Sequence, residues 1–91
     1  MIKDIIILGS TGSIGESTLK SLSKDKNFRI KLLTTNKNLK SIYNQAIVNK
    51  VKNIIVENED EFNKYKLKFK KKKINLYLGI NNINKIIKKK K

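Results

Sequence analysis

The sequence predicts an α/β fold in which a parallel sheet carries helices on both faces, with elements in the order β-α-β-α-β-α-β-α. Short apolar, β-branched runs recur along the chain and end at glycine or polar residues. Stretches in which apolar residues have helical spacing separate these runs. The connections are short, and strands that alternate with helices of about ten residues imply right-handed crossovers.

The chain opens with a predicted strand and a predicted helix. Residues 4–8 (DIIIL) form a continuous apolar run, typical of a strand buried on both faces of a parallel sheet. Glycines follow this run. We then expect Ile14, Leu19 and Leu22 to share one face of a helix over residues 13–23.

The next elements are a strand, a helix and a strand. Phe28, Ile30 and Leu32 alternate with basic residues, which is strand periodicity. Residues 53–56 (NIIV) form another short strand. Between them, apolar residues step by 3, 1, 3 and 1 in a clear amphipathic helix: Leu39, Ile42, Tyr43, Ala46 and Ile47.

The last part of the chain is harder to assign. Phe62, Tyr65 and Phe69 have helical spacing, but Tyr65, Leu67 and Phe69 also alternate with lysines, as in a strand. We favour a helix from Glu59, because acidic residues suit its start and lysines its end. Residues 74–78 (INLYL) predict a fourth strand that ends at Gly79. The isoleucines expected on one side of a last helix are Ile80, Ile83, Ile86 and Ile87.

Composition limits the chemistry that the chain can perform. Its 91 residues make one small domain and contain no cysteine and no histidine. Disulfides, thiolate zinc sites, cysteine nucleophiles and a histidine general base are therefore excluded. Any chemistry must come from backbone amides, hydroxyls, lysines and seven carboxylates.

The net charge of +15 allows two interpretations. A positive field attracts polyanions such as nucleic acid or an anionic membrane. However, lysine, isoleucine and asparagine supply 48 of the 91 residues, and a genome rich in A and T codons would give this composition without any such partner. No apolar run is long enough for a membrane span or a signal peptide, so we expect a soluble, cytoplasmic protein without a membrane partner.

The first predicted strand leads into a glycine-rich stretch, ILGSTGSIGES, with the pattern G-x-x-G-x-x-G through Gly9, Gly12 and Gly15. Glycine allows a sharp turn, close approach of a phosphate and close strand–helix packing. The following helix start presents unpaired N–H groups to an anion. The stretch therefore predicts a Rossmann-like dinucleotide site, the alternative being a tight turn without a ligand. Glu16 stands where a P-loop needs lysine, which disfavours an ATPase or GTPase.

The residues after the second strand favour NADP over NAD. An acidic residue about 20 positions beyond the loop usually recognises the free ribose of NAD. Residues 34–38 (TTNKN), which occupy that position, contain no carboxylate. Their hydroxyls, amides and Lys37 suit a 2′-phosphate instead. For Lys37 alone, a solvated surface lysine is the alternative.

These stretches together resemble a known family. ILGSTGSIGESTL, followed by FRIKLLTTNKNLKSI, resembles the N-terminus of 1-deoxy-D-xylulose 5-phosphate reductoisomerase, an NADPH-dependent enzyme of the non-mevalonate route to isoprenoid precursors. The resemblance implies that Asn36 replaces a small residue, often glycine, of the family pattern. The residues that it assigns to NADPH are Thr11, Gly12, Ser13 and Ile14 at the phosphates and adjoining groups, and Lys37 and Asn38 at the 2′-phosphate.

The resemblance also implies which functions of the family this part of the chain is expected to have. The family performs the reductive isomerisation to 2-C-methyl-D-erythritol 4-phosphate, uses Mg²⁺ or Mn²⁺, and is expected to be a homodimer. Its members are several times longer, so we expect residues 1–91 to be the N-terminal part of the NADP-binding domain, inactive alone, without catalytic, metal-binding or substrate residues. The alternatives are a small basic nucleic-acid-binding module and another NADP-dependent α/β oxidoreductase.

Overall fold

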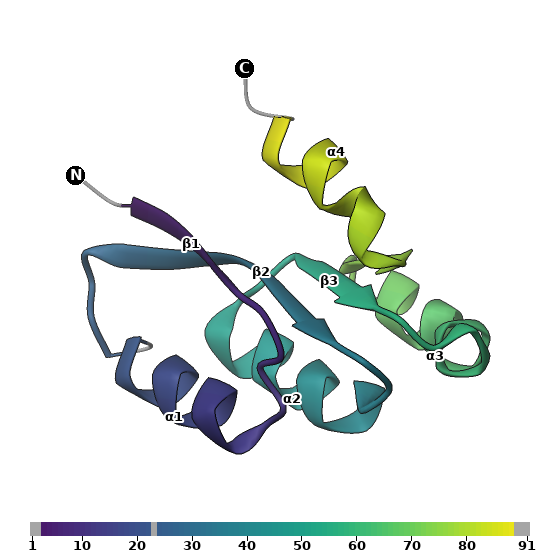
Figure 1. The fold of residues 1–91 in the computed structure, drawn as a ribbon, viewed down its shortest axis with the longest axis horizontal. Coiled ribbons are helices and arrows are strands. Elements are labelled where there is room, and N and C mark those ends of the chain that lie inside the picture. The colour runs from purple at the N-terminus through teal and green to yellow at the C-terminus, as the bar shows by residue number, and fades with distance from the viewer. Residues whose placement is uncertain (1–2, 23, 89–91) are drawn as a thin grey trace.

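The computed structural model describes residues 3–22 and 24–88, except for the side chains of residues 87 and 88, and shows one four-stranded sheet with helices packed on it (Figure 1). All strand pairs are parallel, and the spatial order β1-β2-β3-β4 follows the order along the chain. The strands are β1 (Lys3–Ile7), β2 (Phe28–Thr35), β3 (Asn53–Val56) and β4 (Asn75–Leu78).

Helices cover both faces of this sheet, as the sequence predicts. Right-handed crossovers that add strands in one direction place their helices on one face, and Figure 1 shows α1, α2 and α3 on the same side with α4 opposite. The helices are α1 (Ser13–Leu22), α2 (Leu39–Asn49), α3 (Glu59–Lys71) and α4 (Ile83–Lys88), the last preceded by a 3₁₀ turn, η1 (Ile80–Asn82). None of the helices in the described ranges is long and apolar enough to cross a membrane.

Two hydrophobic clusters hold the layers together. The larger lies between the sheet and α1–α3 and includes Leu33, Leu39, Ile42, Ile54 and Phe69, all without exposed surface. The smaller lies under α4, where Ile86 packs with Leu32 of β2 and Ile55 of β3. β2 at Leu32 and Leu33, and β3 at residues 54–56, are therefore buried on both faces, which explains why apolar residues are consecutive there.

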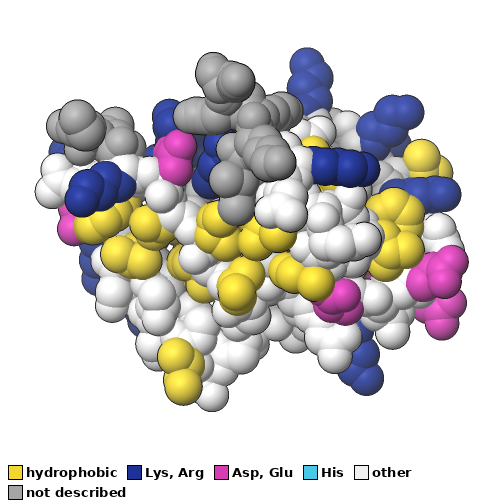
Figure 2. Space-filling view, turned by 45° about the horizontal axis from the view of Figure 1, so that its top comes forward, with side chains coloured by type: hydrophobic (Ala, Val, Ile, Leu, Met, Phe, Trp, Pro, Cys, Tyr) yellow, Lys and Arg dark blue, Asp and Glu magenta, His cyan; other side chains and the backbone are white. Residues whose placement is uncertain are grey.

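The expectation that residues 4–8 are buried on both faces is wrong. β1 is an edge strand of the described sheet, where Asp4 is exposed and Ile5 and Ile6 are half-buried. Ile7 is buried, but Leu8 follows the strand and is 62% exposed. A band of hydrophobic side chains, bordered by charged side chains that are mostly basic, crosses the face drawn in Figure 2. An apolar run by itself does not distinguish a central strand from an edge strand.

The predicted face of the first helix is also partly wrong. Leu19 is buried and Leu22 is half-buried, but Ile14 is 83% exposed. A helix advances about 100° per residue, so Ile14 and Leu19 lie about 140° apart and cannot share one face. Ile47, expected on the apolar face of α2, is likewise 44% exposed, whereas Ala46 is buried.

The ambiguous segment after residue 58 is a helix, as we favoured. Asn58 caps it, since its Oδ1 accepts a hydrogen bond from the Glu61 N–H at 2.9 Å. In a strand, Leu67 would lie on the same face as Tyr65 and Phe69. Leu67 is instead 67% exposed, whereas Phe69 is fully buried. The Phe69 ring packs edge-on against Tyr43 of α2, with ring centroids 5.2 Å apart.

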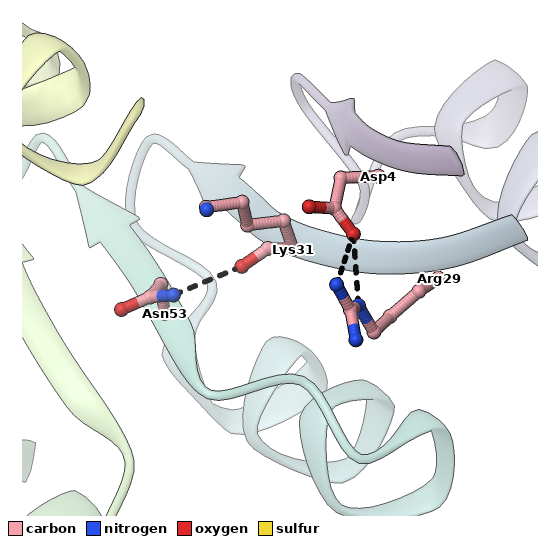
Figure 3. Close-up of polar contacts among 4 residues, drawn as sticks. All are labelled: Asp4, Arg29, Lys31 and Asn53. Carbon is pink, nitrogen blue, oxygen red and sulfur yellow. Dashed lines mark hydrogen bonds and ion pairs between the residues drawn. The ribbon is translucent and has the colours of Figure 1, made fainter. Parts of the chain in front are cut away.

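Polar contacts tie the strands together at their amino-terminal ends (Figure 3). Arg29 donates to Asp4 at 2.8 Å across β1 and β2, and Asn53 Nδ2 donates to the Lys31 carbonyl oxygen at 3.2 Å across β2 and β3. Arg29 is largely exposed, so this ion pair adds little stability. The opposite, carboxyl-terminal ends of β1 and β2 lead into the candidate site.

Candidate functional site

The glycine loop leaves the carboxyl end of β1 and lies beside the end of β2. The Gly9 N–H donates to Thr34 Oγ1 at 2.9 Å, and the Ser10 N–H donates to the Thr34 carbonyl oxygen at 3.0 Å. In open α/β sheets, ligands bind in the crevice outside the carboxyl ends of the strands. The loop therefore lies at the edge of the sheet where a ligand is expected.

Two of the three loop glycines are required by the fold itself. Gly9 has a φ of 66°, in the left-handed region that favours glycine. At Gly15, a Cβ would overlap the Gly9 carbonyl oxygen and lie 2.8 Å from the Ser10 Cα. Gly9 thus makes the turn, and Gly15 lets α1 pack closely against the loop.

Gly12 has no such internal reason to be glycine. It is exposed, its φ is not in the left-handed region, and a Cβ there would make an ordinary contact 3.6 Å from the Gly9 carbonyl oxygen. The protein could accommodate a side chain at this position. The exposed backbone at Gly12 therefore lacks a side chain although no packing contact requires this. Close approach of a ligand to the backbone would require it.

Free backbone N–H groups surround Gly12. The Gly12 N–H itself donates to the Gly9 carbonyl oxygen at 3.1 Å, and α1 closes its first turn with a bond from the Glu16 N–H to the Gly12 carbonyl oxygen at 2.8 Å. Among the described residues, no protein acceptor pairs with the N–H groups of Thr11, Ser13 or Ile14. These donors lie at the positive end of the α1 dipole, an arrangement that attracts an anion.

A hydroxyl pair joins the loop to the β2–α2 connection. Thr11 Oγ1 and Thr35 Oγ1 are 2.8 Å apart, and the Asn38 N–H donates to the same Thr35 oxygen at 3.3 Å. Asn38 then caps α2, since its Oδ1 accepts a hydrogen bond from the Ser41 N–H at 3.3 Å. Lys37 is exposed beside it. All six residues predicted from the sequence therefore lie at the same edge of the sheet: Thr11, Gly12, Ser13, Ile14, Lys37 and Asn38.

Asn36, where the resemblance implies a small residue, does not use a left-handed backbone. Its φ is not among the positive values of the described residues. Instead, its carbonyl oxygen accepts hydrogen bonds from the N–H groups of Glu57 and Asn58, at 3.2 and 2.9 Å. The turn is therefore held by the start of the β3–α3 connection, and glycine is not needed there.

The sequence did not reveal which residues support the loop. Ser10 is fully buried and bonds to Gln45 of α2, while Thr34 and Thr35 are buried at the end of β2. Hydroxyl residues in a loop give no sign of burial, and Gln45 lies 35 positions from Ser10. A groove of about 600 Å³ was also not predicted, because its lining comes from two separate elements, the β1 edge and the start of α1. Its lining residues include Ile5, Leu8, Gly12 and Ile14.

The described residues offer no ligand set for a metal ion. Within them, no group of three or more aspartate, glutamate, histidine or cysteine side chains lies close enough to hold one. The acidic residues at 57 and 59–61 begin α3 or precede it. They act there as a helix start, which negative charge stabilises.

Comparison with known proteins decides the family. The family model described as 1-deoxy-D-xylulose 5-phosphate reductoisomerase matches residues 5–91. The chain belongs to this family. The reductoisomerase of Pelagibacter ubique is 43% identical over 86 residues, and that of Campylobacter lari is 40% identical over 57 residues. These matches cover 93% and 63% of this chain, but only 22% and 16% of the relatives, so the chain spans about a fifth of their length.

Solved reductoisomerases have the same fold over this region. The Zymomonas mobilis reductoisomerase in complex with NADPH superposes with a TM-score of 0.83 at 23% identity, covering 94% of this chain and 23% of that one. A reductoisomerase in complex with NADPH, fosmidomycin and magnesium gives a TM-score of 0.81 at 25% identity, covering 93% of this chain and 21% of that one. The four-stranded sheet described above is thus the fold of the corresponding part of the reductoisomerases.

Proposed function

We propose that this chain is the NADPH-binding N-terminal part of a 1-deoxy-D-xylulose 5-phosphate reductoisomerase. The observation that carries the proposal is the difference among the three loop glycines. The fold accounts for Gly9 and Gly15, whereas Gly12 is bare without a packing reason, among N–H groups without protein acceptors. A dinucleotide pyrophosphate would account for both features.

In this proposal, the two halves of the site bind the two charged parts of NADPH. The backbone N–H groups of Thr11, Ser13 and Ile14 would donate to the pyrophosphate, over the open backbone of Gly12. Lys37 and the Asn38 side chain would hold the 2′-phosphate; because Asn38 Oδ1 is occupied as the helix cap, its amide N–H groups are the donors. In the reductive isomerisation, NADPH would supply the hydride. The residues named here would bind and orient the NADPH molecule.

Other features of the family stay predictions for the complete protein. They are the reductive isomerisation itself, the homodimer and the cytoplasmic location. That the catalytic and metal-binding residues lie outside this part of the chain also stays a prediction, which rests on the resemblance to the longer members of the family.

Lys37→Ala should weaken NADPH binding about tenfold to a hundredfold and leave NADH binding nearly unchanged. A hydrogen bond to a charged group contributes about 1.5–3 kcal/mol, and only NADPH carries the 2′-phosphate. Titration calorimetry with both nucleotides measures the two affinities. Lys52→Ala is the matched control, since Lys52 is exposed at the amino end of β3, away from the site. Equal losses for NADPH and NADH would contradict the assignment.

A nucleic-acid-binding function has less support from the aromatic side chains. Tyr43 and Tyr65 both pack edge-on against Phe69, and the Lys68 ammonium lies 4.5 Å from the centroid of the Tyr43 ring. These rings are engaged within the protein, whereas single-stranded nucleic acid needs open aromatic faces for stacking.

The experiment that tests the proposed function is a pair of titrations of the whole chain, one with NADPH and one with duplex DNA. We expect saturable NADPH binding, and DNA binding that fades by about 0.3 M salt, because a purely electrostatic association weakens steeply with salt. DNA binding that persists at that salt, without a response to NADPH, would overturn the proposal in favour of a basic nucleic-acid-binding module.

A further inference from the structure

Gln45 of α2 makes two hydrogen bonds to one residue of the glycine loop. The Ser10 hydroxyl donates to Gln45 Oε1 at 2.7 Å, and Gln45 Nε2 donates to the Ser10 carbonyl oxygen at 2.9 Å. The amide of Gln45 thus accepts from the side chain and donates to the backbone of the same residue. A pair of bonds of this kind fixes both the distance and the orientation of the loop relative to α2.

Ser10 depends on these bonds because it is fully buried. Its N–H is paired with the Thr34 carbonyl oxygen at 3.0 Å, and Gln45 satisfies its other two polar groups. Buried polar groups are almost always hydrogen-bonded, since losing a partner without regaining water is unfavourable. Without Gln45, the loop would have to shift until the Ser10 hydroxyl and carbonyl reached water.

The position of Gln45 along α2 connects the two halves of the candidate site. Asn38 caps the start of α2, and Gln45 lies about two turns further along the same helix. A short helix moves as a rigid unit. Together with the bonds of the loop to Thr34 and Thr35, the contact between Gln45 and the loop therefore fixes how far the glycine loop lies from the segment that holds Lys37 and Asn38.

We propose that Gln45 is a positioning residue: through Ser10, it holds the glycine loop where the bare backbone of Gly12 meets the pyrophosphate of the dinucleotide. The inference rests on the proposed NADPH function for the identity of the ligand. Its structural half, that Gln45 fixes the loop, concerns the ligand-free chain and can be measured separately.

The test is Gln45→Met, which keeps the length of the side chain and removes both hydrogen bonds. We expect NADPH to bind about tenfold more weakly. In the ligand-free chain, hydrogen exchange measured by NMR should be about tenfold faster at the amides of Gly9, Ser10 and Gly12, which bond within the loop or to Thr34. The amides of β3 should keep their exchange rates. Asn44→Met is the matched control, because Asn44 is the exposed neighbour on the same helix.

Ser10→Ala provides a second, milder variant. It removes the bond to Gln45 Oε1 but keeps the bond from Gln45 Nε2 to the backbone, so we expect an intermediate loss of affinity and an intermediate rise in loop exchange. The double variant should lose no more than Gln45→Met alone, since both act through the same contact. Should Gln45→Met fail to fold, Ser10→Ala decides the proposal by the same measurements.

Three outcomes would overturn the inference. Loop amides that exchange at the wild-type rate in Gln45→Met would mean that Gln45 does not fix the loop. Faster exchange with unchanged NADPH affinity would leave it a structural contact without a role in the site. A uniform rise in exchange that includes β3 would mean general destabilisation. If the wild-type chain does not bind NADPH, the proposed function fails, while loop exchange still decides whether Gln45 positions the loop.

Discussion

Gly15→Ala is expected to lower the free energy of unfolding by about 3 kcal/mol, at the upper end of the usual cost of overpacking. The added methyl group would overlap the Gly9 carbonyl oxygen and lie 2.8 Å from the Ser10 Cα. Both are backbone atoms, and Ser10 is held by bonds to Thr34 and Gln45, so neither can move aside cheaply. Small domains have about 5–15 kcal/mol in total, so the loss is large. Urea denaturation followed by far-ultraviolet circular dichroism measures it.

Gly12→Ala is the control for this substitution. Its methyl group would lie 3.6 Å from the Gly9 carbonyl oxygen, an ordinary contact, so the denaturation midpoint should stay close to that of the wild type. A midpoint for Gly15→Ala equal to that of Gly12→Ala would show that α1 does not need close contact with the loop. The assignment of separate roles to the two glycines would then be wrong.

Gly12→Val should abolish measurable NADPH binding, with a loss of affinity of at least about a hundredfold, or roughly 2.7 kcal/mol. The side chain would stand over the free N–H groups at the start of α1, in the space proposed for the pyrophosphate. Because Gly12 is exposed and its φ is not in the left-handed region, the fold should tolerate the change. Titration with NADPH, followed by the fluorescence of the reduced nicotinamide, measures the affinity.

Ser17→Val is the matched control for this prediction, because Ser17 is exposed on α1, the helix that follows Gly12. It introduces the same side chain into α1 and should leave NADPH affinity unchanged. If Gly12→Val binds NADPH as tightly as the control, the loop is only a turn between β1 and α1. The proposed contact between its backbone and phosphate would then be excluded.

Local patterns in the sequence predicted most of the elements. The apolar run at 53–56 is β3, and the run at 74–78 contains all of β4. The acidic residues at the start of α3 and the lysines at its end predicted a helix that begins at Glu59. The errors came where a residue's surroundings lie far away in the sequence. Leu8 belongs to an apolar run but is exposed, because β1 has no strand on its outer side in the described sheet. Ile14 is exposed because it faces away from Leu19, the buried residue of α1.

The sequence predicted the residues that we propose to contact the ligand, but it did not predict the residues that support them. Gly12 was recognisable because it belongs to a glycine pattern that follows the first predicted strand. Lys37 was recognisable because it follows the second predicted strand in a segment without a carboxylate. Ser10, Thr34 and Gln45 were not, since each is an ordinary polar residue until the fold buries it or places a partner beside it. No local pattern relates Ser10 to a glutamine two elements later.

The sequence by itself determined the α/β order, the glycine turn and the family, because these depend on residue types at short spacings along the chain. Only the tertiary structure decided which glycine serves the turn, which the packing of α1 and which remains open to a ligand. It also decided that Thr35 and Gln45 hold the loop. The physical reason is that steric room, burial and hydrogen-bond partners are properties of neighbours in space, and parallel crossovers bring those neighbours together from distant parts of the chain.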